Sequence, residues 1–240
     1  MAETGGWRLA SLASEWPAYN VATAVSAGFG APADPTAPLE AAFAGLAGYR
    51  VWLRDGMDEA ESALRGAGFE LTVELPAYWR RLGRAWQPLV PAGYRVYRAE
   101  SPEDVADAIL GDRWGGFMED AEAARTFPDP LAMAAEGERR FYVARDGDRL
   151  VATGQSHWME GVVGIYGMWT ADRHRRRGLA TAILHLALAE AAGEGLEYAT
   201  LQASELGIGI YERSGFRAYC RYRVYRPPAA IDRARTGGQT

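Results

Sequence analysis

The sequence predicts a mixed α/β fold in which one complete domain follows a smaller α/β segment. Three observations predict it: short runs of alternating apolar residues, helical patterns between those runs, and an apolar strand candidate that leads through a basic turn into a long helical stretch. The chain has 240 residues, of which 48% are hydrophobic and 24% charged. This composition is typical of globular domains, and the length allows one large domain or two small ones.

The composition excludes several classes of protein. No apolar run approaches the ~20 residues of a membrane span, and the N-terminal stretch lacks the continuous apolar core of a secretory signal. Cys220 is the single cysteine, which excludes an intramolecular disulfide framework. We therefore expect a cytoplasmic protein that does not bind a membrane. The net charge of −5 disfavours nucleic acid as a partner, because nucleic-acid-binding domains usually present a broad basic surface.

Prolines divide the chain into two parts. Before Pro88 and Pro91 the pattern predicts alternating short strands and helices, the last of them a helix over residues 77–86. We place the domain boundary at these prolines. The predicted organisation is an N-terminal α/β subdomain over residues 1–92, a main domain over residues 93–228 and a frayed tail over residues 229–240.

The main domain shows a regular order of predicted elements. A strand and a helix come first, and the segment 113–130 after them is predicted as a loop, rich in tryptophan, glycine and acidic residues. Three strands follow, the first two joined by the hairpin signal Asp146-Gly147-Asp148. A long helix, a strand, a short helix and a last strand complete the order. Gly215 suits a left-handed cap on the short helix.

The sharpest local pattern joins the strand candidate Val162–Trp169 to a helix whose apolar face runs to Ala191. The turn between them is Arg175-Arg176-Arg177-Gly178-Leu179-Ala180. The first amides of a helix have no internal partners, and the helix dipole adds partial positive charge there. Gly178 lets a ligand approach the backbone closely, and the arginines add formal charge. The turn is therefore predicted to bind an anion such as a diphosphate.

At these residues the sequence resembles the GCN5-related N-acetyltransferases, whose coenzyme A signature is Arg/Gln-x-x-Gly-x-Gly/Ala. Farther along, Ile210-Tyr211-Glu212-Arg213-Ser214-Gly215-Phe216 resembles the closing motif of the family, Leu-Tyr-Glu-Lys-x-Gly-Phe. Two motifs in register are far more specific than either alone, and the resemblance covers Tyr94 to Pro228. It implies the fold of that family, a mixed central sheet with antiparallel N-terminal strands and flanking helices.

The resemblance implies acetyl-CoA as co-substrate and direct attack of an amine on the thioester in a ternary complex. No metal is expected, because the histidines show no ligand spacing. The pantetheine arm is expected along the strand before the turn, where Gly164 and Gly167 indicate a bulge that aims the amide of Met168 or Trp169 at the thioester oxygen. The residues implied in binding the co-substrate are Met168, Trp169, Thr170, Arg175, Arg176, Arg177, Gly178, Leu179, Ala180, Thr181 and Tyr211.

Tyr211 is the candidate acid, because a phenol with an ordinary pKa near ~10 is protonated at neutral pH and can donate to a leaving thiolate. The resemblance implies a tyrosine at this position, and the alternative is a core aromatic residue without a catalytic role. Met168 is the candidate donor to the oxyanion, and Glu119 is the candidate base. The alternatives to Glu119 are a chain of water molecules or one of Asp120, Glu122, Glu160, Glu205 and His157.

The N-terminal segment contains an echo of the second motif. Ala63-Leu64-Arg65-Gly66-Ala67-Gly68-Phe69 is followed by a strand, as Ile210–Phe216 is, and Tyr49–Arg54 would correspond to Tyr198–Ala203. One interpretation is a degenerate, half-length copy of the acetyltransferase fold that has lost its basic turn. The other is that helix-Gly-Phe-strand is a common local arrangement.

The leading hypothesis is an N-acetyltransferase that moves an acetyl group from acetyl-CoA to an amine of a small molecule. Variants of this hypothesis have a protein as acceptor or a longer acyl group as donor. A different class is a non-catalytic acyl-CoA-binding sensor, against which the presence of Tyr211 argues. The sequence leaves open the identity of the acceptor and whether the chain forms a homodimer.

Overall fold

A computed structural model of the chain describes residues 2–4, 6–11, 20–24, 37–44, 48–83, 87–114 and 139–228. The protein has the mixed α/β fold that the sequence predicts, with both parallel and antiparallel strand pairs. Its contacts divide the chain into two compact units. Unit 1 is Met1–Pro76 with Cys220–Thr240, and unit 2 is Ala77–Tyr219.

Unit 2 contains the signature turn. Its strand order is β5-β10-β9-β8-β7-β6, in which β9 and β10 pair in parallel and the other neighbours pair antiparallel. The strands of this order are β5 (Glu70–Arg81), β6 (Tyr94–Arg98), β7 (Arg139–Asp146), β8 (Arg149–Met159), β9 (Val162–Thr170) and β10 (Tyr198–Gln202). A further strand, β11 (Arg217–Arg226), begins in unit 2 and continues in unit 1. The helices are α3 (Pro102–Trp114), α6 (Leu179–Gly193), α7 (Ile208–Arg213) and the 3-10 turn η2 (Asp172–His174).

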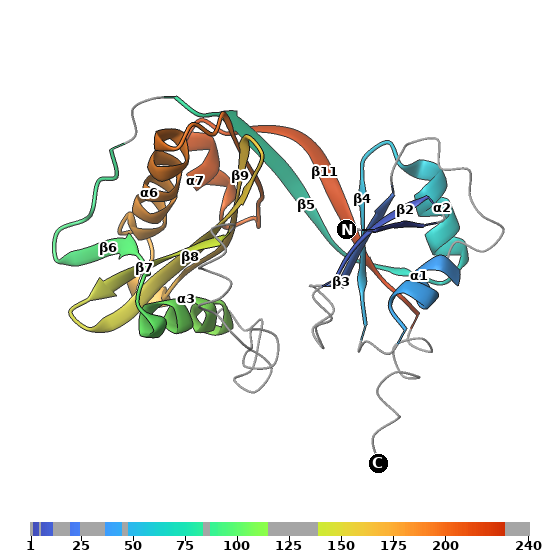
Figure 1. Ribbon diagram of the computed structural model, residues 1–240, viewed down its shortest axis with the longest axis horizontal. Coiled ribbons are helices and arrows are strands. Elements are labelled where there is room, and N and C mark those ends of the chain that lie inside the picture. Colours follow the sequence, from blue (N-terminus) through green and yellow to red (C-terminus); the bar gives the residue numbers. More distant parts are fainter. Residues whose placement is uncertain are drawn as a thin grey trace, which may run out of the picture. The chain divides into compact units, whose positions relative to one another are not determined.

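Helices α3 and α6 lie on opposite sides of strands β7, β8 and β9 (Figure 1). On the α6 side, Ile183, Leu184 and Leu188 pack with Val163 and Ile165 in one hydrophobic cluster. Full burial of such a side chain contributes on the order of 2 kcal/mol. This packing fixes the N-terminus of α6 against the end of β9, which is where the signature turn lies.

Unit 1 has the strand order β1-β2-β3-β4-β11-β5, in which β3 and β4 pair in parallel and β11 pairs with β4 antiparallel. Its own elements are β1 (Ala2–Thr4), β2 (Trp7–Ser11), β3 (Asn20–Ala24), β4 (Arg50–Arg54), α1 (Ala37–Ala42) and α2 (Asp58–Gly66). Both helices contribute to one core, through Leu39 from α1 and Leu64 from α2. The core is closed by fully buried Trp7, Tyr49 and Leu53.

The echo in the sequence is also present in the structure. In unit 1 a parallel pair, β3–β4, is followed in the sheet by an antiparallel strand, and in unit 2 the pair β9–β10 is followed by antiparallel β5. Helix α2 ends with Phe69 N–H donating to Leu64 O (2.9 Å), as α7 ends with Phe216 N–H donating to Tyr211 O (3.0 Å). Gly68 and Gly215 have φ of 82° and 80° in these turns. Unit 1 therefore repeats part of the strand order of unit 2, with leucine where unit 2 has Tyr211.

One predicted element in the middle of the chain differs from the structure. The predicted helix over residues 77–86 is wrong as far as Arg81, because residues 77–81 continue β5 and pair with β10. Tertiary pairing overrides the local pattern there, since β10 needs an antiparallel neighbour. Residues 84–86 lie outside the described residues.

The units also divide at other positions than the predicted domains. The division lies at Pro76 instead of residue 92, since β5 has already joined unit 2 before the prolines. The chain from Cys220 onward belongs to unit 1, because Tyr222–Tyr225 pair with β4. The predicted tail, 229–240, lies outside the described residues. None of the helices that the structure describes has the length and apolar character needed to cross a membrane.

Candidate active site

Strand β9 contains the irregularity that its glycines predict. Thr153 pairs with Trp169 and Gln155 with Tyr166, so the single residue Gly154 on β8 faces two residues of β9, Gly167 and Met168. Gly167 has φ of 55°, a conformation that glycine adopts without strain. This is a β-bulge, and a bulge leaves its extra residue without a regular ladder partner. A main-chain N–H at Gly167–Met168 can therefore serve a ligand.

Gly154 is required for this bulge, although it was not among the site residues predicted from the sequence. A Cβ at Gly154 would lie 2.6 Å from Met168 Sδ and 2.7 Å from Ile183 Cγ2. The absence of a side chain lets Met168 lie between β8 and α6. The available signal was a glycine inside a predicted strand, which often marks a bulge or a close approach.

Strands β9 and β10 part beside the bulge. Their parallel pairing covers Val162–Gly164 and Tyr198–Thr200, after which β10 continues to pair with β5 through Leu201 and Gln202. In the described part of the sheet, the edge of β9 beyond Gly164 is thus not covered by β10. Such an edge offers main-chain donors and acceptors to an extended ligand, as an added strand would use them.

The signature turn forms a concave group of N–H donors at the start of α6. Arg176 and Gly178 have φ of 61° and 85°, and Arg176 is the one non-glycine residue with positive φ within the described chain. The first helical hydrogen bond runs from Ala182 N–H to Gly178 O (2.9 Å). The N–H groups from Gly178 to Thr181 therefore have no acceptor inside the helix. Successive N–H groups in such conformations form an anion site, and the helix dipole adds to it.

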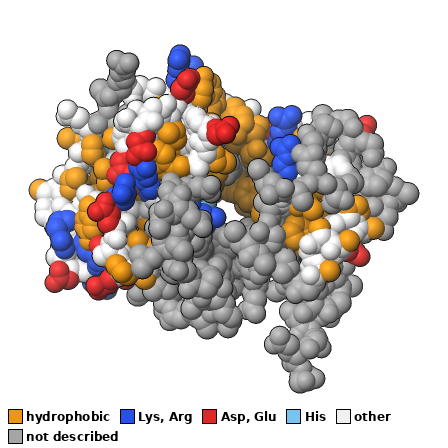
Figure 2. Space-filling view, in the orientation of Figure 1, with side chains coloured by type: hydrophobic (Ala, Val, Ile, Leu, Met, Phe, Trp, Pro, Cys, Tyr) orange, Lys and Arg blue, Asp and Glu red, His pale blue; other side chains and the backbone are white. Residues whose placement is uncertain are grey.

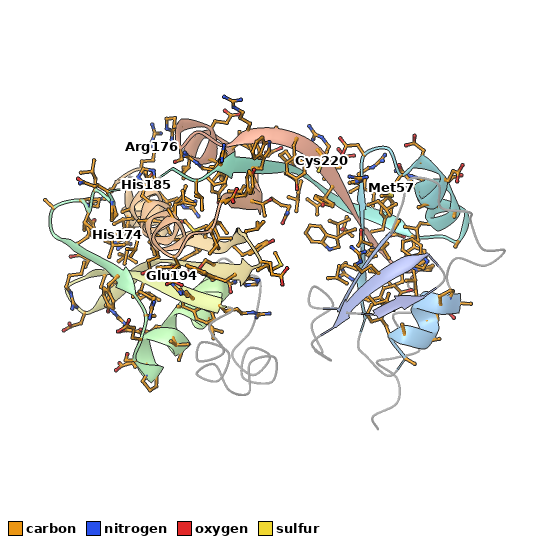
Figure 3. The ribbon with its side chains drawn as sticks, turned by 45° about the horizontal axis from the view of Figure 1, so that its top comes forward. Met57, His174, Arg176, His185, Glu194 and Cys220 are labelled. Atoms are coloured by element: carbon orange, nitrogen blue, oxygen red, sulfur yellow. The ribbon has the colours of Figure 1, made fainter. Side chains whose placement is uncertain are left out.

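The arginine side chains of the turn mainly brace it. Arg175 Nη2 lies 2.9 Å from an Asp172 carboxylate oxygen, and its Nε donates to Thr170 O (3.2 Å). Arg177 Nη1 donates to the Tyr94 hydroxyl (3.1 Å), which also lies 3.1 Å from His174 Nδ1. Arg176 and His174 lie beside α6 (Figure 3). Tyr94, which was not among the site residues predicted from the sequence, therefore supports the turn.

The first residues of α6 differ in what they can offer a ligand. Leu179 is buried in the core, so its contribution is limited to its main-chain N–H. Ala180, Thr181, Thr170 and Trp169 are half-buried. The small Ala180 side chain keeps the first turn accessible, as the signature pattern implies.

Tyr211 lies in α7 and is 7% exposed. Its ring packs against Phe216 with 6.0 Å between ring centroids, and it belongs to the hydrophobic cluster that includes Met168 and the apolar face of α6. Burial raises the pKa of Tyr211 to about 12. Within the described residues, its hydroxyl has no hydrogen-bond partner. Tyr211 is therefore a protonated phenol in the same cluster as the bulge residue.

The candidate bases are only partly described. Glu119, with Asp120 and Glu122, lies outside the described residues. Glu160 and Glu205 are exposed, and His157 is half-buried on β8. Burial and the charge of Arg139 lower the pKa of His157 to about 4, so its imidazole is neutral at physiological pH. No group of three His, Cys, Asp or Glu side chains that could hold a metal ion occurs among the residues the structure describes.

Replacing Gly178 by alanine is expected to weaken, by about tenfold, the acetyl-CoA binding that the sequence predicts, a change in free energy of about 1.4 kcal/mol. An added Cβ would lie 3.5 Å from Pro91 Cγ, an ordinary contact, so the cost arises from the left-handed backbone. That conformation costs an L-residue about 1 kcal/mol, and relief of the strain would turn the N–H groups away. Calorimetry with acetyl-CoA measures the affinity.

Gly193→Ala is the matched control for Gly178→Ala. Gly193 ends the same helix without a positive φ, and a Cβ added to it would meet no atom within 4 Å. The affinity of this variant for acetyl-CoA should equal that of the wild type. An equal loss in both variants would contradict the assignment of the anion site to the turn at Gly178.

Residues 106–216 match the family model described as the acetyltransferase (GNAT) family. The match identifies a GNAT acetyltransferase domain in this part of the chain, and members of that family are acyltransferases. The match lies within unit 2 and includes the bulge, the signature turn and α7. No curated protein sequence matches the chain closely enough to count as a relative.

Solved structures share the fold. A GCN5-related N-acetyltransferase from Kribbella flavida is 24% identical with a TM-score of 0.62, covering 88% of this chain and 82% of that one. A conserved protein of unknown function from Staphylococcus epidermidis is 12% identical with a TM-score of 0.62, covering 95% and 93%. A tandem GNAT protein from the clavulanic acid biosynthesis pathway is 17% identical with a TM-score of 0.55, covering 74% and 63%. Both units thus fall within a known architecture.

Proposed function

We propose that the protein is an N-acetyltransferase that moves an acetyl group from acetyl-CoA to an amine of a small molecule. One observation carries the proposal: the bulge at Gly167–Met168 and the N–H groups at Gly178–Thr181 lie on one continuous strand-turn-helix segment. The segment offers an anion site and a main-chain donor at a fixed separation. A thioester linked to a diphosphate needs both.

Binding would use three parts of unit 2. The diphosphate is held by the N–H groups at the start of α6, and the turn is kept in shape by Asp172 and Tyr94. The pantetheine arm extends along the edge of β9 that β10 leaves uncovered beyond Gly164. The N–H of Met168 then donates to the thioester oxygen, on which negative charge develops in the transition state.

The chemical step is a direct acyl transfer. The amine nitrogen attacks the thioester carbonyl carbon, the carbon–sulfur bond breaks, and the thiolate of coenzyme A takes a proton from the Tyr211 hydroxyl. The amine loses its own proton to a base, for which we propose Glu119, with His157 or a chain of water molecules as alternatives. Because burial raises the pKa of Tyr211 to about 12, the phenol keeps its proton at neutral pH and is available as a donor when the thiolate departs.

Unit 1 is proposed to be a degenerate half of the same fold. Its parallel pair, its added antiparallel strand and its helix-Gly-Phe turn repeat those of unit 2. It has Leu64 where unit 2 has Tyr211, and no arginine occurs between β3 and β4, where a signature turn would lie. The tandem GNAT protein with a similar fold supports this proposal. We therefore expect one acetyl-CoA per chain.

Calorimetry with acetyl-CoA and a thiol-release assay with a panel of primary amines test the function together. We expect binding of one acetyl-CoA per chain and release of free coenzyme A that depends on the amine. Absence of binding to any acyl-CoA would overturn the proposal. Binding without thiol release on any amine would favour the sensor, and two bound molecules per chain would contradict the degenerate half.

A further inference from the structure

The acceptor must reach the thioester from the side of the sheet that faces away from α6. On the α6 side, the space beside Val163 and Ile165 is filled by the apolar side chains of the helix. Side chains alternate along a strand, so Gly164 and Tyr166 face the other side. The neighbouring residues on that side come from β8 and β10 and are Gln155, His157, Thr200 and Gln202.

These residues form a polar cluster at the point where β9 and β10 part. The Tyr166 ring lies over Gly164, where a Cβ would be 2.5 Å from ring atom Cε2, and its hydroxyl is hydrogen-bonded to the Gln202 side chain. The His157 ring lies 4.7 Å from the Tyr166 ring, and its Nε2 is 3.3 Å from Gln155 Oε1. Among its described members the cluster holds no carboxylate. It can hydrogen-bond a neutral amine but offers no charge to attract an ammonium group.

Unit 2 also contains a cavity of about 290 Å³ that, unlike the uncharged polar cluster, is lined by arginines. Its lining residues are Trp79, Arg80, Arg81, Gly215 and Arg217. Arg80 is engaged, since its Nη1 donates to Ser214 O and its guanidinium lies over the Phe216 ring. Arg81 and Arg217 have no carboxylate or hydrogen-bond partner for their guanidinium groups among the residues that are described. The cavity therefore presents two available cations beside Trp79, which is 39% exposed.

This arrangement differs from most of the surface of unit 2. Basic and acidic side chains are interspersed on the face shown in Figure 2, and arginines such as Arg95 and Arg98 lie within 4 Å of carboxylates. Guanidinium groups that share a cavity without a carboxylate repel one another, so an anion placed between them is stabilised. A planar guanidinium binds a carboxylate or a phosphate through two parallel hydrogen bonds.

One wall of the cavity, Trp79, lies in register with the polar cluster across the sheet. Trp79 pairs with Thr200 on β10, and Thr200 pairs with Gly164 on β9. Because Tyr78 is buried on the α6 side, Trp79 faces the same side as Tyr166. Neighbouring strands lie about 4.8 Å apart, which places Trp79 about 10 Å from Gly164. A small molecule can therefore reach from the parting strands to Trp79, and Arg81, two residues further along β5, faces the same side.

We propose that the acceptor is an amine that also carries a carboxylate or phosphate group, with the anionic group held by Arg81 and Arg217 beside Trp79 and the amine at the Tyr166–Gln202 cluster. The proposal rests on the proposed acetyl transfer and names its class of substrate. The carboxylate or phosphate group binds the arginines and so contributes the charge-assisted affinity that the uncharged polar cluster does not provide. The carbon chain between the two groups lies along Thr200.

A matched series of acceptors tests the proposal. The probes are ω-aminoalkanoates of increasing length and the primary amides of the same acids, assayed by thiol release with acetyl-CoA. The acids should have at least about tenfold higher kcat/KM than the amides, the difference of one charge-assisted contact. The double variant Arg81→Gln/Arg217→Gln should abolish this preference by raising KM for the acids to that for the amides. Arg149→Gln, an exposed arginine on the β7–β8 hairpin, is the matched control and should keep the preference.

A binding measurement separates failure of this proposal from failure of the proposed function. Protein saturated with coenzyme A is titrated with the same acids and amides by calorimetry, which needs no turnover. The acids should bind, and the double variant should weaken their affinity about tenfold while its affinity for coenzyme A stays unchanged. Equal binding of acids and amides, an acid preference that survives in the double variant, or no binding of either series would overturn the proposed acceptor class. Absence of thiol release from a protein that binds the acids would count against the transferase and leave the anion cavity in place.

Discussion

Tyr211→Phe is expected to lower kcat by about 10²–10⁴-fold, the range over which a positioned proton donor contributes. The substitution keeps the ring that packs against Phe216 and removes only the hydroxyl proton. Without a donor, the thiolate of coenzyme A must leave as a free anion inside an apolar cluster. The affinity for acetyl-CoA should stay within about twofold of the wild type, because no ground-state hydrogen bond of the hydroxyl to the described residues is lost. Steady-state kinetics and calorimetry measure the two quantities separately.

Tyr142→Phe is the control for this prediction. The Tyr142 hydroxyl also lies in unit 2, where it donates to Glu190 (3.1 Å) and lies 3.2 Å from Ser156 Oγ. Its loss should cost about 1 kcal/mol of stability and leave kcat unchanged. Full turnover in Tyr211→Phe, or an equal loss in both variants, would show that Tyr211 is a core aromatic residue without a role in the reaction.

The raised pKa of Tyr211 also predicts how the rate of the proposed reaction depends on pH in the alkaline range. In the proposed reaction the phenol is the active form, and it stays protonated until the pH approaches about 12. Turnover should therefore show no decline from this residue between pH 7 and pH 10. The pH–rate profiles of the wild type and of Tyr211→Phe should be compared. A decline between pH 7 and pH 10 that occurs in the wild type and not in Tyr211→Phe would contradict the assignment of Tyr211 as a donor with a pKa of about 12.

Arg145→Met is expected to lower the free energy of unfolding of unit 2 by about 3 kcal/mol at pH 7, the scale for breaking a buried ion pair. Arg145 is 9% exposed and holds α3 to β7. Its Nη2 lies 2.8 Å from Asp104 Oδ1 and forms a second ion pair with Asp107. Methionine fills a similar volume and leaves both carboxylates without their cation. Urea denaturation followed by tryptophan fluorescence measures the loss.

The ion pairs of Arg145 with Asp104 and Asp107 also predict how this loss of stability depends on pH. Burial raises the pKa of Asp104, but hydrogen bonds from Arg145, Tyr97 and Ser101 outweigh it and hold the pKa below its ordinary value. A depressed folded-state pKa contributes stability above the unfolded pKa of about 4, and this contribution is lost as the pH falls through the folded value. In Arg145→Met the Asp104 carboxyl is still buried but has lost the arginine that lowers its pKa. Its pKa should therefore rise, so that it binds a proton at a higher pH than in the wild type. The stability deficit should therefore be smaller at pH 4 than at pH 7.

Arg149→Met is the control for Arg145→Met. Arg149 is exposed on the other side of the same hairpin turn, and its loss should change the free energy of unfolding by less than about 0.5 kcal/mol. A deficit in Arg145→Met that grows on acidification would contradict the role given to Asp104. A loss in free energy of unfolding smaller than that of Arg149→Met would show that the ion pairs of Arg145 do not stabilise the packing of α3 on β7.

The local sequence determined the parts of the site that depend on neighbours along the chain. The turn Arg175–Ala180 and the helix after it follow from glycine, arginine and a 3.6-residue apolar period, all within one segment. The bulge at Gly167 followed from glycine inside an apolar strand, and the cap at Gly215 from a glycine after a short helix. These features are fixed by backbone conformation, so a short stretch of residues specifies them.

Contacts between distant residues were decided by the tertiary structure alone. Residues 77–81 have a local pattern compatible with a helix, and they form a strand because β10 pairs with them from more than a hundred residues away. Three other features also depend on contacts between residues far apart in the sequence. They are the hydrogen bond from Arg177 to Tyr94, the close approach of Gly154 to Met168, and the cavity that Trp79 and Arg217 both line. Strand pairing follows the sheet order, which no short segment encodes. The chain by itself therefore specified the turn to which we assign the co-substrate, and only the assembled sheet brings together the residues that we propose for an acceptor with an anionic group.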